Sequence, residues 1–307
     1  MPRLKVATML SLATLFTSAF GQGMNAARPG TLNYVEGHAA LEGRAVLPNS
    51  IRNLTMNAGQ SLSTSDGRVE VLLTPGVFLR LDHDTTIKMV SPNLTQTEVE
   101  VDRGRVDLEV DALYKQNDLL VDIGKTQTKV LEHGLYQFDG TAGQLKVFEG
   151  KAAVSPAENA TKWIDVKGGH ELALNGDFSK PKGFDKLQAE DELYSWSSLR
   201  ADYLGQANQG LLQQEYAGAP GIYPGWAWDS DFYGYTWLPT DGFLYSPFGY
   251  GFYSPGFFYG GGFGYGGGFY RGGGFRGGYG GGFGGRAAGG FGGGGGGFHG
   301  GGGGGHR

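Results

Sequence analysis

The segment Gly59–Leu81 most constrains what this chain can fold into. It contains a glycine-led turn, an alternating run, the turn dipeptide Pro75-Gly76 and a second alternating run. Side chains that alternate with a period of two indicate a strand with one buried face. The predicted core positions of these two strands are Val69, Val71, Leu73, Val77, Leu79 and Leu81, while Arg68, Glu70 and Thr74 mostly fall on the opposite face.

Alternating segments recur throughout residues 31–178. They include Glu98–Asp102, Arg105–Asp111, Gln144–Glu149 and Glu171–Leu174. Gly, Pro, Asn and Asp separate them roughly every dozen residues, which is typical of all-β domains. The sequence therefore predicts an all-β fold, an antiparallel β-sandwich or roll, over 31–178.

Acidic residues gather on the polar sides of these segments. In Arg105–Asp111, the apolar residues Val106, Leu108 and Val110 share one side. The acidic set is interpreted as a solvated face and comprises Glu98, Glu100, Asp102, Asp107, Glu109 and Asp111. On this interpretation Glu109→Ala changes the melting temperature little, whereas Leu79→Ala lowers it clearly.

Three glycines each stand just before a predicted strand, where glycine can adopt positive φ at a turn or bulge. They occur in Glu36-Gly37-His38-Ala39, Arg103-Gly104-Arg105-Val106 and Glu149-Gly150-Lys151-Ala152. Together with Gly59–Leu81 and Gly134-Leu135-Tyr136, these motifs make 31–175 resemble the FecR-like domain, the periplasmic part of ferric-citrate-type regulators that also occurs in other bacterial envelope proteins. The resemblance implies a β fold, an envelope location and a binding or sensing role rather than an enzymatic one.

Residues Met1–Gly21 are expected to be a secretory signal peptide. Arg3 and Lys5 precede a largely apolar run, and Ala19-Phe20-Gly21 suits cleavage before Gln22. The alternative is an uncleaved anchor, although the run is short for a spanning helix, which needs about 20 residues. The chain has no cysteine, so a lipid-modified N-terminus is excluded. The expected location is the periplasm or the cell surface.

The C-terminal part divides into three predicted segments. Helical spacing of apolar residues predicts a helix over 184–212. The segment 216–255 is rich in aromatics and interrupted by prolines, which predicts short extended pieces and turns. The segment 256–307 is a low-complexity, glycine-rich tail that is expected to be disordered by itself, because it has few side chains to bury.

The FecR-type regulators carry a cytoplasmic region and a spanning helix before the β domain. Here only about twenty residues precede that domain, so direct control of a sigma factor is not expected.

Few residues suggest chemistry. Asp82-His83-Asp84 is the only local cluster of metal-capable residues. The resemblance to FecR-like domains implies a turn between strands here, and since adjacent strand residues point to opposite faces, the three side chains are not expected to converge on one ion. There is no H-E-x-x-H or G-x-S-x-G motif, and a chain without cysteine has no thiol chemistry. No catalytic, cofactor-binding or metal-binding residue is predicted.

The tail carries Arg271, Arg276 and Arg286 among Gly, Phe and Tyr, as RNA-binding tails do. The predicted export and the net charge of −5 argue against a nucleic-acid partner. Self-association of the tail, contact with sugars or membranes, and a plain spacer remain as alternatives.

Two functions follow from these patterns. The first is an exported, non-enzymatic binding or structural protein of the envelope, with an envelope protein or polysaccharide as its partner. The alternative is a periplasmic sensing or signal-transduction partner of a membrane protein.

Overall fold

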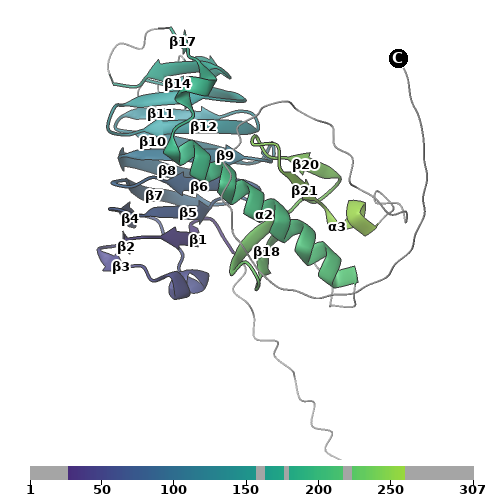
Figure 1. Ribbon diagram of the computed structural model, residues 1–307. Coiled ribbons are helices and arrows are strands. Elements are labelled where there is room, and N and C mark those ends of the chain that lie inside the picture. The colour runs from purple at the N-terminus through teal and green to yellow at the C-terminus, as the bar shows by residue number, and fades with distance from the viewer. Residues whose placement is uncertain (1–26, 157–162, 176–179, 217–222, 260–307) are drawn as a thin grey trace, which may run out of the picture. The chain divides into compact units, whose positions relative to one another are not determined.

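The computed structural model describes residues 27–156, 163–175, 180–216 and 223–259. Two β-sheets lie face to face, and one long helix crosses the outer face of one of them (Figure 1). The first sheet, sheet A, has the order β1 (Thr31–Glu36), β5 (Arg68–Leu72), β6 (Val77–Leu81), β9 (Arg105–Val110), β12 (Gly134–Asp139), β13 (Gln144–Val147), β16 (His170–Ala173) and β17 (Lys182–Gly183).

The second sheet, sheet B, packs against the inner face of sheet A. Its order is β15 (Ile164–Lys167), β14 (Lys151–Ser155), β11 (Thr126–Val130), β10 (Asp118–Ile123), β8 (Gln96–Arg103), β7 (Thr86–Asn93), β4 (Ser61–Thr64), β2 (Ala39–Leu41) and β3 (Arg44–Ala45). Among the described pairs, β8 and β10 are parallel and the others are antiparallel. The predicted antiparallel β-sandwich, followed by one main helix, is confirmed.

The remaining elements are short, apart from the long helix. They are the 3₁₀ helix η1 (Pro48–Asn53), α1 (Lys186–Ala189), α2 (Glu192–Tyr216), the hairpin of β18 (Gly225–Asp229) and β19 (Gly234–Leu238), the hairpin of β20 (Phe243–Tyr245) and β21 (Gly251–Tyr253), and α3 (Pro255–Phe257).

The predicted core positions lie between the two sheets. All six are fully buried: Val69, Val71, Leu73, Val77, Leu79 and Leu81. The cross-strand partners of β5 and β6 include Val71 with Leu79, so successive core residues form rows across sheet A. The strand pattern therefore identified this face of both strands correctly.

The three glycines before strands adopt the left-handed conformation. Their φ angles are 66° at Gly37, 79° at Gly104 and 92° at Gly150. A Cβ at Gly104 would also lie 2.5 Å from Thr85 Cα and 2.8 Å from the Asp84 carbonyl oxygen, which is closer than atoms can approach. The expected glycine turns are confirmed, and these positions favour the residue without a side chain.

The outer face of sheet A is also buried, which corrects the sequence interpretation. The polar residues Glu70 and Thr74, placed opposite the core, are as buried as the core itself. Asp107, Glu109 and Asp111 were interpreted as part of a solvated face, yet they are also buried. The physical reason is that α2 and the two aromatic hairpins cover this face. Alternation within a strand separates its two faces but does not show whether a distant element packs on the polar one.

The other members of that acidic set behave differently. Glu98 and Glu100 are half-buried and Asp102 is exposed, on strand β8 of sheet B. The solvated-face interpretation therefore holds at Asp102, holds in part at Glu98 and Glu100, and is wrong for the three residues on or directly after β9.

The helix expected over 184–212 is divided in two. The helix is interrupted between α1 and α2 at Asp191, whose carboxylate accepts a hydrogen bond from the Tyr194 amide at 2.9 Å. A carboxylate in this position caps the first turn of α2 and favours its start there. Most of the apolar stripe predicted for this helix is buried, with Arg200 rather than its alternative Leu199 facing inward and Tyr203 exposed. The buried members are Leu193, Trp196, Arg200, Leu204, Ala207 and Leu211.

The aromatic segment forms the two hairpins, in agreement with the predicted short extended pieces. It joins α2 and sheet A in a second apolar cluster, whose buried members are Leu72, Phe78, Leu204, Tyr235, Trp237 and Phe252. The Asn33 side chain donates to the Tyr235 carbonyl and accepts from the Tyr235 amide, which fixes β19 next to β1.

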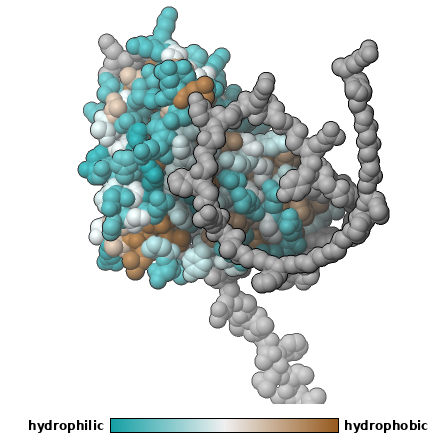
Figure 2. Space-filling view, viewed as in Figure 1, coloured by the Kyte–Doolittle hydropathy of each residue, from teal (hydrophilic) through white to brown (hydrophobic). Residues whose placement is uncertain are grey.

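Two predicted segments fall outside the described residues, namely the signal peptide Met1–Gly21 and nearly all of the tail 256–307. No helix within the described ranges is long and apolar enough to span a membrane. The visible surface of the described part is mostly hydrophilic with small hydrophobic patches (Figure 2).

Candidate functional site

A polar network joins the outer face of sheet A to α2. Its centre is Glu70 on β5, which is fully buried. The Glu70 carboxylate accepts hydrogen bonds from Arg80 Nε, Arg200 Nη2 and Asn33 Nδ2 at 2.9, 2.9 and 2.8 Å. Burial would raise the pKa of Glu70, but the charges of Arg200 and Arg80 and their hydrogen bonds lower it to about 2. Glu70 therefore stays ionised and holds Arg200 of α2 against the sheet.

The second carboxylate partner of Arg80 is Glu109 on β9. Burial raises the pKa of Glu109 even though the Arg80 charge opposes it. Asp111 follows on the same side of the chain, and neither of its carboxylate oxygens has a hydrogen-bond partner. Burial, followed by the charge of Glu109, raises the pKa of Asp111 well above its usual range. One arginine thus faces more carboxylates than it can neutralise.

Asp107 lies two residues before Glu109 on the same face of β9, beneath the first two turns of α2. Its carboxylate accepts from the Ser197 hydroxyl of α2 at 2.8 Å and from Gln137 Nε2 of β12 at 3.2 Å. Burial raises the pKa of Asp107 to about 7, and the charge of Asp191 adds to this while the two hydrogen bonds oppose it. Its protonation state therefore changes near neutral pH.

The turn between β6 and β7 contains the Asp82-His83-Asp84 cluster. Asp82 is buried, and its carboxylate accepts from Arg68 Nε at 3.0 Å and from Arg105 Nη2 at 2.6 Å. Burial works against ionisation, but the Arg68 hydrogen bond and the Arg105 charge keep the pKa of Asp82 below its usual range. His83 and Asp84 form the turn itself, as expected from the sequence. The three side chains do not converge on one point.

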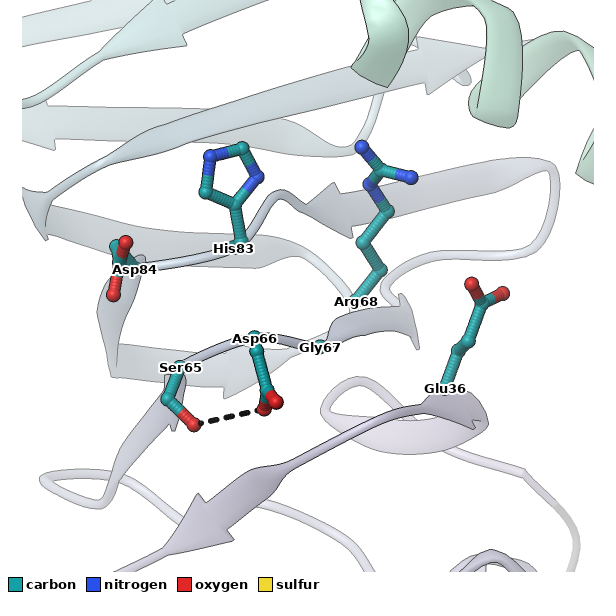
Figure 3. Close-up of a pocket in the computed structure, with 7 residues that line it drawn as sticks. All are labelled: Glu36, Ser65, Asp66, Gly67, Arg68, His83 and Asp84. Atoms are coloured by element: carbon teal, nitrogen blue, oxygen red, sulfur yellow. Dashed lines mark hydrogen bonds between the residues drawn. The ribbon is translucent and has the colours of Figure 1, made fainter.

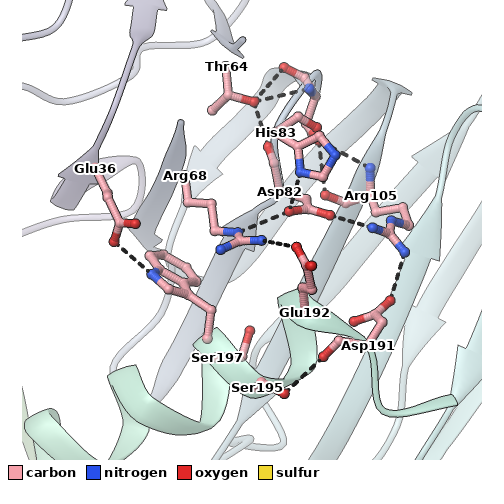
Figure 4. A network of polar contacts seen from close by, with 12 residues as sticks. Glu36, Thr64, Arg68, Asp82, His83, Arg105, Asp191, Glu192, Ser195 and Ser197 are labelled. Atoms are coloured by element: carbon pink, nitrogen blue, oxygen red, sulfur yellow. Dashed lines mark hydrogen bonds and ion pairs between the residues drawn. The ribbon is translucent and has the colours of Figure 1, made fainter. Parts of the chain in front are cut away.

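The two arginines bound to Asp82 also contact the start of α2. Arg105 Nη1 donates to Asp191 at 2.8 Å, and Arg68 Nη2 lies 3.4 Å from the carboxylate of Glu192 (Figure 4). Figure 4 shows Asp82 between the two guanidinium groups, with the acidic start of α2 on their other side. A continuous chain of ion pairs therefore runs from the β6–β7 turn to the helix.

A hollow of about 490 Å³ adjoins this turn (Figure 3). Its lining residues are Glu36, Ser65, Asp66, Gly67, Arg68, His83 and Asp84. His83 has 49% of its side chain exposed, and its Nδ1 lies 2.9 Å from the buried Asp82 carboxylate. Cationic and acidic groups share this surface, so it suits a polar or charged partner group rather than an apolar one. We call it the β6–β7 corner.

A second polar hollow, of about 510 Å³, lies on the outer face of sheet B. The parallel pairing of β8 and β10 sets Asp122 beside Glu100, and Glu98 beside Leu120. Burial, followed by the Glu98 interaction, raises the pKa of Asp122 to about 7. No pair of carboxylates was expected here, because the strands are apart in sequence and their parallel pairing leaves no local signal.

The sequence predicts no catalytic, cofactor-binding or metal-binding residue in this chain. Within the described ranges, no three or more His, Cys, Asp or Glu residues are grouped so as to hold a metal ion. Four buried carboxylates with shifted pKa values line neither hollow, namely Glu70, Asp107, Glu109 and Asp111. Asp122, by contrast, lines the hollow on sheet B. The sequence signal that could have found them is opposite charge at the outward positions of separate strands, with Glu70 on β5, Arg80 on β6 and Asp107 on β9, which the sheet pairs with one another.

Comparison with known proteins finds a family model that matches part of this chain. Residues 60–153 match the family model described as FecR protein, a stretch that covers β4 to most of β14. The chain therefore carries a FecR-like domain, as the sequence motifs indicated. No curated protein matches the chain.

Two crystal structures are similar over part of the chain. Both are titled as a "putative anti-sigma factor" from Parabacteroides distasonis ATCC 8503, at 2.50 and 1.65 Å resolution. Sequence identity is 15% and 14%, and the TM-score is 0.35 in both comparisons. The match covers 42% of this chain and spans 62% of the length of each of those chains.

Proposed function

We propose that this protein is a sensing and signal-transduction component of the bacterial cell envelope, and that it acts by binding another protein rather than by catalysis. The FecR-like match over residues 60–153 supports this class. The proposal includes export by the N-terminal segment Met1–Gly21 to the periplasm or cell surface. The partner is a membrane protein of the same envelope.

The observation that carries the proposal is the chain of ion pairs from the β6–β7 corner to α2. A binding protein that transmits a signal needs a surface whose occupation changes an element elsewhere. A partner that pairs with Arg68 or His83 competes with Asp82 for these groups. That competition weakens the contact of Arg68 with Glu192. It also changes the electrostatic potential at Asp191, where α2 begins, because Arg105 is paired with both Asp82 and Asp191.

The experiment is photo-crosslinking in the producing cell. A photoreactive amino acid is placed at His83, which is half exposed in the corner, and in a matched variant at Asp102, which is exposed on sheet B. We expect a discrete protein adduct from position 83 and none from position 102. Equal adduct patterns at both positions, or no adduct at either, contradict a corner that binds a protein.

A second candidate function is that of an envelope-binding or structural protein. It is favoured by aromatic side chains that remain exposed in the segment 223–259, such as Tyr223 and Tyr245. Exposed aromatic rings stack on sugar rings, so the partner would be an envelope polysaccharide. Co-sedimentation with purified envelope polysaccharide, compared between wild type and a Tyr223→Ser, Tyr245→Ser double variant, tests it. Equal sedimentation of the two proteins argues against it.

A further inference from the structure

Charge is not balanced beneath α2. Each of six charged side chains there is at most a tenth exposed. They are the carboxylates of Glu70, Asp107, Glu109 and Asp111 and the guanidinium groups of Arg80 and Arg200. Four negative groups facing two positive ones leave two negative charges uncompensated in a region that excludes water. Since a buried charge without a partner is strongly unfavourable, this interface is stable only if it holds protons.

Geometry indicates where the protons reside. Glu70 contacts both arginines and needs no proton. Glu109 shares Arg80 with Glu70, and one of its oxygens has no partner; both oxygens of the neighbouring Asp111 are also without one. A proton held between Glu109 and Asp111 removes their repulsion and supplies a missing donor. The groups that face this pair are Arg80 from β6 and Glu70 from β5.

Asp107 holds the other proton, at the contact between sheet and helix. Its two hydrogen-bond donors are Ser197 from α2 and Gln137 from β12. Gln137 also donates to Asp191 at 3.1 Å, so the same small region contains a second carboxylate. The charged and titratable groups that face Asp107 are Asp191 before α2, Tyr194 on α2 and Arg80 on β6.

We propose that the docking of α2 on sheet A is linked to proton binding, with a proton held at Asp107 while the helix is docked and released when it detaches. Detachment exposes Asp107 to water, where a carboxylic acid gives up its proton readily. The helix is therefore docked more tightly at mildly acidic than at neutral pH. The polar contacts that hold its first turns, through Ser197, Arg200 and Asp191, make this the element that responds first.

The size of the effect follows from proton linkage. Between the two pKa values of Asp107, the ordinary 3.8 and about 7 when buried, the docked state binds about one more proton than the detached state. The docking equilibrium then weakens by up to about tenfold for each pH unit in that window. From pH 5 to pH 7 the detached fraction is expected to rise about 50-fold through Asp107 alone.

Hydrogen exchange of the full chain, followed by mass spectrometry at pH 5, 6, 7 and 8, measures this. Protection factors, corrected for the intrinsic pH dependence of exchange, are compared between α2 peptides and peptides from β14 and β15 of sheet B. We expect protection of α2 to fall by 10- to 100-fold between pH 5 and pH 7, in line with the linkage above, while protection of sheet B changes little. A fall shared equally by both regions would mean global unfolding and would overturn a helix-specific response.

The variant Asp107→Asn carries a permanently uncharged group of the same shape. Its α2 protection should change less than threefold between pH 5 and pH 7. The matched control is Asp102→Asn, an exposed acid that should keep the wild-type response. If wild-type α2 protection changes less than twofold, or if Asp107→Asn keeps the full pH dependence, the proposal is wrong. The wild-type measurement decides the question even if the variant folds poorly.

Discussion

Removing the carboxylate of Glu70 should be among the most destabilising single substitutions in this protein. Glu70→Ala leaves the guanidinium groups of Arg80 and Arg200 without their main counter-charge, and the Asn33 amide without an acceptor. All of this takes place in a region closed to water, because Glu70 and Arg80 are fully buried and Arg200 is 8% exposed. The expected loss in the free energy of unfolding at pH 7 is about 3–5 kcal/mol, the range for breaking one side of a buried ion pair.

An independent route gives a similar magnitude. The native structure lowers the pKa of Glu70 from its ordinary 4.5 to about 2. That difference corresponds to about 3 kcal/mol of stability at neutral pH, since each pKa unit is worth about 1.4 kcal/mol. The two free-energy values for Glu70 agree, although the first comes from the general cost of breaking a buried ion pair and the second from proton linkage.

The assay is urea unfolding followed by far-ultraviolet circular dichroism, with Glu100→Ala as the matched control. Glu100 is also a mid-strand glutamate on an outer sheet face, but it is half-buried and its nearest cation, Lys88 Nζ, is 3.8 Å away. The control should stay within about 0.5 kcal/mol of wild type. If Glu70→Ala loses less than about 1 kcal/mol, the buried network does not stabilise α2 as its geometry indicates.

Three further outcomes can be measured with the same protein. Leu79→Ala should lower the free energy of unfolding by about 2–5 kcal/mol, because the removed atoms leave a cavity between the sheets; a loss below about 1 kcal/mol would contradict its burial. Glu109→Ala, which strand alternation alone would make neutral, should lower the free energy of unfolding by about 1–3 kcal/mol, because Arg80 loses a charged partner. An unchanged melting temperature would show that Glu70 alone satisfies this arginine. The folded-state pKa of Glu70 is depressed, so its contribution is complete above about pH 4.5 and is lost as the pH falls towards 2. Acid titration of wild type and Glu70→Gln should show that only wild type loses this part of its stability.

The interface under α2 differs from the core between the sheets. The core is formed by aliphatic and aromatic side chains, whereas the interface combines ion pairs near the start of the helix with an apolar cluster around Trp237 further along it. Burying charge is costly unless every group finds a partner, so the polar half is more sensitive to pH and to competing ligands than the apolar half. This difference favours movement at the start of α2, where Asp191 and Glu192 meet the arginines of the β6–β7 corner.

Several features of this protein follow from local sequence. The alternation of Val69, Val71 and Leu73 identifies one face of a strand, because side chains of a strand point to opposite sides in turn. Glycine before a strand at Gly37 and Gly104 predicts the positive φ that both adopt. These features depend only on neighbours in the chain, and they are enough to recognise the β-sandwich and the resemblance to FecR.

The other half of the architecture depends on contacts between distant segments. Alternation shows that Glu70, Asp107 and Glu109 lie opposite the core, but it does not show what covers them. Their cover, α2, begins more than eighty residues after β9, and its fit depends on Arg200 reaching Glu70. A strand pattern is local, whereas burial of its second face is decided by whichever distant element packs there, and so the same residues can be solvated in one fold and form the buried centre of an interface in another.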